Sequence, residues 1–490
     1  MKQASAKSKI IKMIITILVG IVIFVLPTPE GLSVHAWGYL ALFIALIVGL
    51  ILEPIAPALL SLITIAIAIL FKIGPVGTEY GHVNAQTAVQ WGLSGFANTV
   101  VWLIFSAFMI GIGFTKSGLG RRISLYLVSK LGKKTLGLGY AIAIIDGILA
   151  PFIPSNAARS GSMYPMISSI PPMFDSTPEN NPRKIGSYLA YTACAAGCVS
   201  SSIFLTASSS NSLALAFISK AGMVVPNWLS WFVAMLPVSI ILFLLTPLLV
   251  YWFYPPTLKG SPEIVTWAKD ELKSVGKMKK EEYFMLLISV VALVLWIGGS
   301  YFHIHSTTTA LVVAIAMVIL KVITWNDFLS NKPAWNVMVW LATLVTMAGG
   351  LKNVGFIEWI STKFDHLFIG FPPFVAIIGL LLLFSFLRYF FASNTAFATA
   401  FMTIFVILAQ SIPGTDPVKT VLFLVLPMGF VGILAPYTTG PTTVWYASGY
   451  IKSSDFWRLG ITFGMLYLII FMVIGMPYIN LIYPYLSFAR

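Results

Sequence analysis

Long apolar runs, separated by short polar stretches, fill most of the sequence. Runs such as 13–26, 100–114 and 230–254 contain no charged residue, which is typical of helices that cross a bilayer. The alternation of apolar and polar residues that a membrane β-barrel requires is missing from them. The pattern therefore predicts an all-α polytopic membrane protein with about 11 transmembrane helices. The candidate crossings are residues 13–28, 36–52, 55–71, 99–115, 187–219, 230–254, 283–302, 307–323, 335–350, 419–450 and 459–483.

Two further apolar segments, 136–171 and 372–411, do not fit this series of crossings. The first arm of the earlier segment, 136–151, reaches roughly 24 Å as a helix, whereas a full crossing takes about 20 residues. Its tip should therefore lie near the middle of the membrane. We predict that both segments are re-entrant hairpins, which enter the membrane and leave on the same side.

The charge content supports this topology. Only 9% of the residues are charged, against about 25% in soluble domains, which excludes an ordinary soluble enzyme. With two re-entrant hairpins, most of the 30 lysines and arginines fall on the side of the N-terminus. The positive-inside rule then places the N-terminus in the cytoplasm and the C-terminus outside, in a bacterial inner or plasma membrane. The net charge of +14 thus sets the orientation, and we expect no nucleic-acid partner.

One long polar segment, 255–282, divides the chain near its middle, and its charges are spaced as on a surface helix. We expect a cytoplasmic linker helix here. The predicted parts of the chain are a first span at 1–35, a first repeat at 36–254, this linker and a second repeat at 283–490.

The two halves of the chain share short motifs in one register. Ser155-Asn156 corresponds to Ser393-Asn394, and both pairs lie in the middle of a predicted hairpin. In the predicted topology, hairpin 136–171 enters from the cytoplasm and hairpin 372–411 from outside. The two repeats are then inverted, which is the architecture of many secondary transporters.

Polar clusters interrupt the apolar segments at corresponding places in both halves. Ser and Asn are favoured N-caps, so each hairpin tip should begin a helix whose positive end points into the protein centre, as in anion sites. Irregular polar backbone at this depth is tolerated where it lines a cavity, although small residues can also serve close helix packing. The later clusters are Thr206, Ser208, Ser209, Ser210 and Asn211, and then Pro436, Thr438, Thr439, Gly440 and Pro441.

Few charges are predicted at membrane depth, and they favour an anion. A cation carrier normally needs carboxylates in its core, where we find Asp146 with Arg159 and Arg388. Arg159 can act as a fixed counter-charge for a carboxylate, or form a salt bridge to Asp146. For Arg388 a structural role is equally open. Hydrolase and phosphate-loop motifs are missing from the sequence, so we expect neither an enzyme nor a cofactor or resident metal.

The motifs resemble those of the divalent anion/sodium symporter family, especially its 2-oxoglutarate/malate translocators and citrate/succinate antiporters. The resemblance rests on residues 154–161, on Ser393-Asn394-Thr395, and on Gly440-Pro441 followed by residues 448–451. It implies a homodimer with a scaffold domain and an elevator-like transport domain that carries small dicarboxylate anions. The substrate residues that it implies are Ser155, Asn156, Ala157, Ser393, Asn394 and Thr395, with cation-site loops at 206–211 and 436–442.

One position departs from the sodium-coupled pattern, which has threonine where this chain has Ala157. Together with Arg159, this suggests a carrier that exchanges dicarboxylates such as malate, succinate, fumarate and 2-oxoglutarate without sodium, the guanidinium taking the place of a bound sodium ion. A sodium-coupled di- or tricarboxylate symporter is the nearer alternative, and an anion channel is the more distant one.

Overall fold

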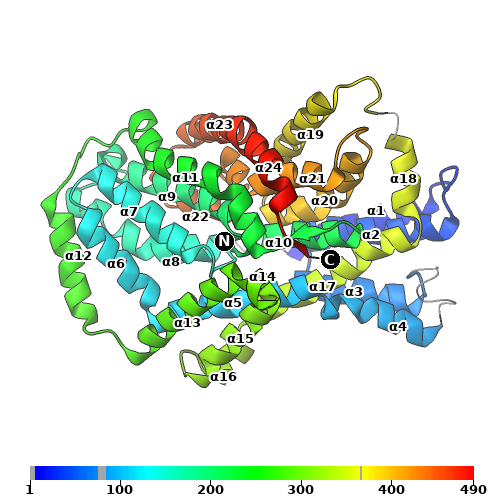
Figure 1. Cartoon of the computed structure of the whole chain (residues 1–490), viewed down its shortest axis with the longest axis horizontal. Coiled ribbons are helices and arrows are strands. Elements are labelled where there is room, and N and C mark those ends of the chain that lie inside the picture. Colours follow the sequence, from blue (N-terminus) through cyan, green and yellow to red (C-terminus); the bar gives the residue numbers. More distant parts are fainter. Residues whose placement is uncertain (1–5, 75–83, 365–366, 490) are drawn as a thin grey trace.

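A computed structural model of the chain consists almost entirely of helices and describes residues 6–74, 84–364 and 367–489 (Figure 1). Within this part of the chain, seven helices are long and apolar enough to cross a membrane, by length and composition. The helical class is thus confirmed, while the number of about 11 crossings stays a prediction. The seven candidate spans are Lys7–Val25, Val34–Leu52, Thr99–Ser117, Trp228–Phe253, Lys332–Asn353, Pro373–Phe390 and Ser453–Tyr485.

One group of helices packs around the long helix α17 (Lys332–Asn353). The backbone N–H of Gly95 donates to Thr346 Oγ1 at 2.9 Å, and a Cβ on Gly95 would lie 1.9 Å from the Ala342 carbonyl oxygen. Only glycine permits this close approach. The helices of this group that contact α17 are α2 (Val34–Leu52), α3 (Pro57–Leu70), α4 (Ala85–Leu93), η1 (Ser94–Ala97), α5 (Thr99–Ser117) and α18 (Phe356–Phe364), while α1 (Ala6–Val25) packs on α2.

Two apolar helices are each followed by a break and a second helix, inside the segments predicted as hairpins. Helix α7 (Thr135–Leu149) precedes α8 (Asn156–Ser168), and α19 (Pro373–Leu387) with η5 (Arg388–Phe390) precedes α20 (Asn394–Gln410). The second helix of each pair begins directly after the serine of the Ser-Asn motif, as the N-cap preference predicts. The motif thus marks the start of a helix in both halves.

Two other helical stretches are interrupted at the polar clusters found in the sequence. Helix α9 (Gly186–Ile203) is separated from α10 (Ser209–Lys220) by the short turn η4 (Leu205–Ala207). In the second half, extended residues separate the turns that follow α21 (Pro417–Val425) from α22 (Gly440–Ala447). We call residues 204–209, which include the first residue of α10, the first break, and residues 435–439 the second break.

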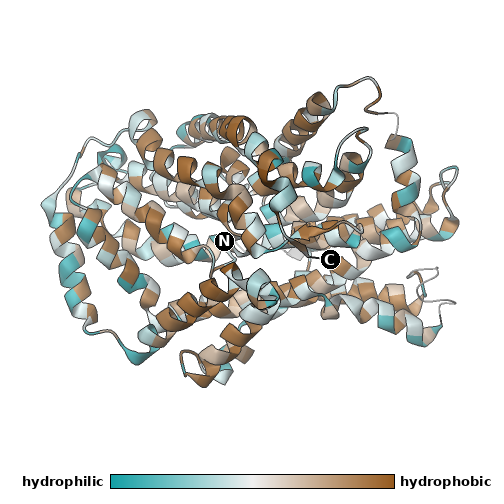
Figure 2. Cartoon of the chain, viewed as in Figure 1, coloured by the Kyte–Doolittle hydropathy of each residue, from teal (hydrophilic) through white to brown (hydrophobic). Residues whose placement is uncertain are grey.

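The remaining elements complete the two halves. Figure 2 shows that most helices are largely hydrophobic, whereas hydrophilic residues gather in loops and on the helix labelled α12 in Figure 1. Strand β2 (Phe488–Ala489) pairs antiparallel with β1 (Val225–Pro226). The other remaining helices are η2 (Pro171–Phe174), η3 (Pro182–Lys184), α11 (Trp228–Phe253), α13 (Lys280–Ile297), α14 (Gly299–Phe302), α15 (Ser306–Ile319), α16 (Trp325–Leu329), η6 (Leu426–Met428), η7 (Phe430–Leu434), α23 (Ser453–Ile470), the π-helical η8 (Phe471–Gly475), α24 (Met476–Ile482) and η9 (Tyr483–Tyr485).

The polar segment in the middle of the chain contains the amphipathic helix α12 (Pro262–Val275), which packs on α6 (Leu119–Leu131). Ile264 and Ala268 are buried, while most charged residues of α12 are exposed, namely Glu263, Lys269, Asp270 and Lys273. Behind this helix, Arg122 forms a bidentate pair with the buried carboxylate of Glu282 at 2.7 and 2.9 Å. The same guanidinium donates to the carbonyl oxygens of Gly276 and Lys277. Arg122 therefore fastens the end of the linker to α6.

These contacts of Arg122 predict that Arg122→Ala destabilises the protein. The substitution leaves the Glu282 carboxylate buried without its cation, which costs about 3 kcal/mol in comparable pairs. We expect a clearly lower melting temperature of the purified protein in detergent. Arg121→Ala is the matched control, because Arg121 pairs with Glu271 at the surface, where an ion pair contributes less than about 1 kcal/mol. Equal melting temperatures for the two variants would contradict a structural role for the Arg122 pair.

Candidate functional site

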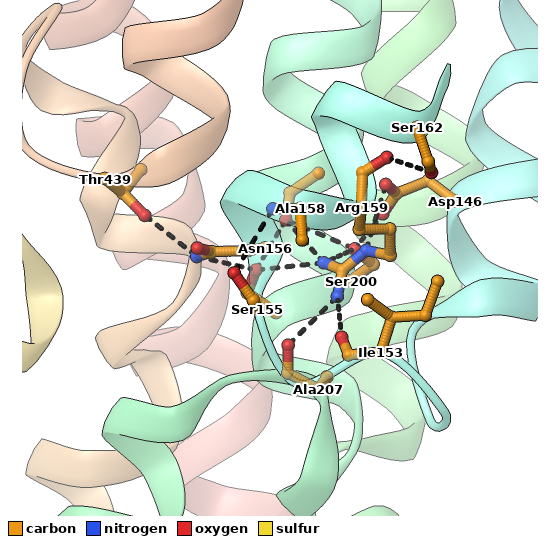
Figure 3. A network of polar contacts seen from close by, with 12 residues as sticks. Asp146, Ile153, Ser155, Asn156, Ala158, Arg159, Ser162, Ser200, Ala207 and Thr439 are labelled. Atoms are coloured by element: carbon orange, nitrogen blue, oxygen red, sulfur yellow. Dashed lines mark hydrogen bonds and ion pairs between the residues drawn. The ribbon is translucent and has the colours of Figure 1, made fainter. Parts of the chain in front are cut away.

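The first hairpin tip is held by its N-cap and by a contact with the second half of the chain. The Ala158 N–H donates to Ser155 Oγ at 3.2 Å, which closes the first turn of α8. The side-chain amide of Asn156 donates to Thr439 Oγ1 in the second break at 2.9 Å (Figure 3). Ser155 and Asn156 are half-buried and Ala157 is exposed, so this tip remains accessible.

The second hairpin tip repeats this arrangement. The Ala396 N–H donates to Ser393 Oγ at 3.0 Å, and the hydroxyl of Thr395 lies 3.4 Å from that of Ser209, at the end of the first break. Asn394 is buried, and its amide donates to the Met428 carbonyl oxygen at 3.4 Å. Each tip thus contacts the break that belongs to the other half of the chain, which brings all four predicted clusters together.

Backbone contact is close where the second break meets the first tip. A Cβ on Gly440 would lie 2.4 Å from the Ala157 nitrogen and 2.6 Å from its Cα. A side chain at position 440 would therefore push the two elements apart. Pro441 follows at the start of α22 and approaches Gly197 of α9, where an added Cβ would lie 3.1 Å from the proline ring.

The residues in and next to the two breaks form hydrogen bonds with the first tip and within their own segments. Thr206 donates its hydroxyl to the Pro151 carbonyl oxygen at 2.7 Å, and the Ser209 N–H donates to the Pro154 carbonyl oxygen at 3.0 Å, so the first break supports the first tip. Thr438 donates to the Ala435 carbonyl oxygen at 2.9 Å beside Pro436, within the second break. The other contacts are Asn211 Nδ2 to the Ser201 carbonyl oxygen at 2.7 Å and Ser208 Oγ to Ser210 Oγ at 2.8 Å.

Arg159 lies behind the first tip and is fully buried. Its Nε donates to Asp146 Oδ1 at 3.0 Å, and the other oxygen of that carboxylate accepts from the Ser200 hydroxyl (Figure 3). Of the two roles that the sequence allowed for Arg159, the structure therefore shows the salt bridge to Asp146. The other acceptors of Arg159 are the carbonyl oxygens of Ile153 at 3.1 Å, Ala207 at 2.9 Å and Gly197 at 3.3 Å, and the hydroxyls of Ser200 at 2.9 Å and Ser201 at 3.2 Å.

Ser200 and Ser201 belong to the site although sequence analysis did not single them out. They lie on α9, and Ser201 also accepts from the Asn156 amide at 3.4 Å. The feature of the sequence that points to them is the run Ser200-Ser201-Ser202 inside an apolar helix. Since small residues often serve helix packing, that signal alone does not identify a polar site.

The electrostatics of the assembled site favour an anion. Helices α8 and α20 both begin here, and each helix N-terminus carries roughly half a positive charge. Asp146 is neutralised by Arg159, whereas Arg388 lies behind the second tip with its guanidinium carbon 5.2 Å from the centre of the Phe397 ring. In the described part of the chain, no group of three His, Cys, Asp or Glu side chains could hold a metal ion. The site therefore offers hydroxyls, amides and helix starts for a small anion.

The ion pair behind the first tip predicts a large effect of Asp146→Asn. The substitution leaves the Arg159 guanidinium buried without a counter-charge, which costs about 3–5 kcal/mol in comparable pairs. We expect a strongly lowered melting temperature in detergent. Asp270→Asn is the control for the same chemical change, because the pair of Asp270 with Lys273 is exposed. A melting temperature of Asp146→Asn within 1 °C of the control would refute the structural role of the pair.

Comparison with solved structures shows the kind of fold. The chain resembles the crystal structure of the YdaH transporter from Alcanivorax borkumensis, described as having an unusual topology, with a TM-score of 0.56 over 87% of this chain and 98% of that chain. The sequence identity is 12%, so the likeness concerns the fold. It supports a polytopic membrane architecture.

Sequence comparisons are more specific. The chain is 41% identical to a citrate/succinate antiporter of Escherichia coli strain K12 over 486 residues, which is 96% of this chain and 98% of the relative. It is 42% identical to an L-tartrate/succinate antiporter of the same strain, covering 93% of this chain and 95% of the relative. These relatives are transporters, which confirms the prediction of a transporter rather than an enzyme. The family model for the sodium:sulfate symporter transmembrane region matches residues 7–484, so the chain belongs to this divalent anion/sodium symporter family.

Proposed function

We propose that the protein exchanges small dicarboxylate anions across the membrane. The observation that carries the proposal is the meeting of two capped helix starts with the two breaks, through the contacts Asn156–Thr439 and Thr395–Ser209. Charged acceptors bind strongly to backbone N–H groups, amides and hydroxyls arranged in this way. The names of the relatives, which are antiporters of citrate or tartrate with succinate, support the same substrate class.

The roles of the site residues follow from their positions. Ser155, Asn156, Ser393, Asn394 and Thr395 hold the two carboxylates of the substrate, one at each tip. Ala157 lies at the exposed first turn of α8 and lacks the hydroxyl of the sodium-coupled pattern. Arg159 acts as a positioning residue, since its side chain is engaged with Asp146 and with groups of α9 and the tip loop.

The movement that we propose is of the elevator type, within a homodimer whose N-terminus is cytoplasmic. The contacts between tips and breaks join elements of both halves, which supports their movement as one body. The basic residues near the predicted cytoplasmic loops support the orientation.

A sodium-coupled dicarboxylate symporter is the second candidate, and one observation favours it. Asn211 Oδ1, next to the first break, is buried without a hydrogen-bond donor among the described residues. An unpaired buried acceptor of this kind is suited to a cation. Exchange without sodium remains our first proposal because Ala157 removes one potential oxygen ligand from the first tip.

Reconstituted vesicles test the proposal directly. Vesicles loaded with succinate or malate should take up labelled succinate in sodium-free buffer, and empty vesicles should not, because exchange requires substrate on both sides. A strict requirement for sodium would favour the symporter. Uptake that neither saturates nor responds to internal substrate would instead indicate a channel. Testing malate, 2-oxoglutarate, citrate and tartrate inside the vesicles defines the exchanged substrates.

Alanine at either tip asparagine should weaken substrate binding. Asn156→Ala and Asn394→Ala each remove an amide donor, and a hydrogen bond to a charged group contributes about 1.5–3 kcal/mol. We expect the KM for succinate to rise by about tenfold to hundredfold. Asn227→Ala is the matched control, because Asn227 caps α11 by accepting from the Ser230 N–H and contacts neither tip. Unchanged KM values in both tip variants would show that the tips are structural.

A further inference from the structure

The two hairpins each bring one arginine into the protein interior, and only one of the two is paired. Arg159 behind the first tip has Asp146 as its counter-ion. Arg388 is 1% exposed, and both of its terminal nitrogens lack a hydrogen-bond acceptor among the described residues. The second hairpin therefore holds a buried positive charge that the described part of the protein leaves uncompensated.

The sequence repeat explains why Arg388 lacks a partner. In the register that aligns Ser155-Asn156 with Ser393-Asn394, Asp146 corresponds to Phe384 and Arg159 corresponds to Phe397. These two phenylalanines occupy the place of the ion pair, with their ring centres 4.6 Å apart in an edge-to-face arrangement. Arg388 lies over the second ring, with its guanidinium carbon 5.2 Å from the ring centre. A cation–π contact of this kind recovers only part of the solvation that a buried guanidinium loses.

The position of this charge connects it with the candidate site. Phe397 belongs to the first turn of α20, the helix that begins at the second tip. The guanidinium therefore lies beside the helix start that carries Asn394 and Thr395. The Arg388 guanidinium is thus the group near the second tip that lacks an anionic partner among the described residues.

We infer that Arg388 supplies the positive charge that compensates one carboxylate of the bound dicarboxylate. The inference deepens the proposed function and rests on it. Each helix start adds a local positive potential but no net charge, whereas Arg388 adds one full positive charge, which matches one of the two carboxylates. The Arg159–Asp146 pair is neutral and adds no further charge. The Arg388 guanidinium is buried, where the effective dielectric constant is lower than in water, so its charge is less screened.

The same charge gives a physical reason for exchange. With substrate bound, the Arg388 charge has a carboxylate as its counter-ion, whereas in the empty core it has none. Moving an unpaired charge through an apolar region is costly, so the empty carrier returns slowly. A carrier of this kind exchanges one dicarboxylate for another and resists net transport.

Two variants abolish the unpaired charge of Arg388 in different ways. Arg388→Gln removes the charge itself. Phe384→Asp keeps Arg388 but adds a carboxylate four residues earlier on α19, at the position that corresponds to Asp146, where a pair with Arg388 can form. We expect both variants to raise the KM for succinate at least about tenfold, and to permit uptake of labelled succinate by empty vesicles. Arg388→Lys should keep the KM within about threefold of wild type.

Phe384→Leu controls for the loss of the ring, and Arg458→Gln controls for the loss of an arginine, because Arg458 is exposed and pairs with Asp455. If Arg388→Gln does not yield folded protein, the KM and exchange measurements on Phe384→Asp alone test the inference. Wild-type KM and strict exchange in folded Phe384→Asp or Arg388→Gln would overturn the inference. So would a wild-type melting temperature that rises with chloride but not with succinate, since Arg388 would then hold an inorganic ion. Failure of wild-type exchange would instead contradict the proposed function.

Discussion

Backbone and side-chain polar groups at the breaks must find partners within the protein, and the rest of the structure depends on this constraint. Hydrocarbon offers no hydrogen bonds, so an interrupted helix is tolerated at membrane depth only where other protein groups or a polar cavity satisfy it. Here some of those groups come from the other half of the chain: Asn156 contacts Thr439, and Thr395 contacts Ser209. The polar centre can therefore exist inside a chain that is 58% hydrophobic.

Those features that depend on local residue preferences can be predicted from the sequence. The helix starts after Ser155 and Ser393 follow from N-cap chemistry, and the apolar runs indicate the long helices. The partners of Arg159 could not be predicted in the same way, because they come from α7, α9 and the first break, which meet only through tertiary packing. Pairing with Asp146 was one of two readings that the sequence left open. The roles of Ser200 and Ser201 could not be predicted from the sequence for the same reason.

The two halves keep one architecture but differ in the chemistry behind their tips. In the first half an ion pair connects the helices on either side of the tip, while in the second half two aromatic rings fill the corresponding space. Both solutions hold the hairpin arms together, the first through directed hydrogen bonds and the second through packing and ring geometry. Because these solutions differ in charge, the centre of the protein is electrically asymmetric, and its two tips need not play equal parts in binding.

The crossed contacts between tips and breaks also bear on how such a chain could arise. A half-length chain would contain one tip and one break. In isolation it would keep the contacts within its own half, such as Thr206 with Pro151, but it would leave Asn156 without Thr439, or Thr395 without Ser209. A half-length ancestor would therefore have needed a second copy of itself to complete these contacts. Fusion of the two copies would have made that pairing permanent and allowed the residues behind the two tips to differ.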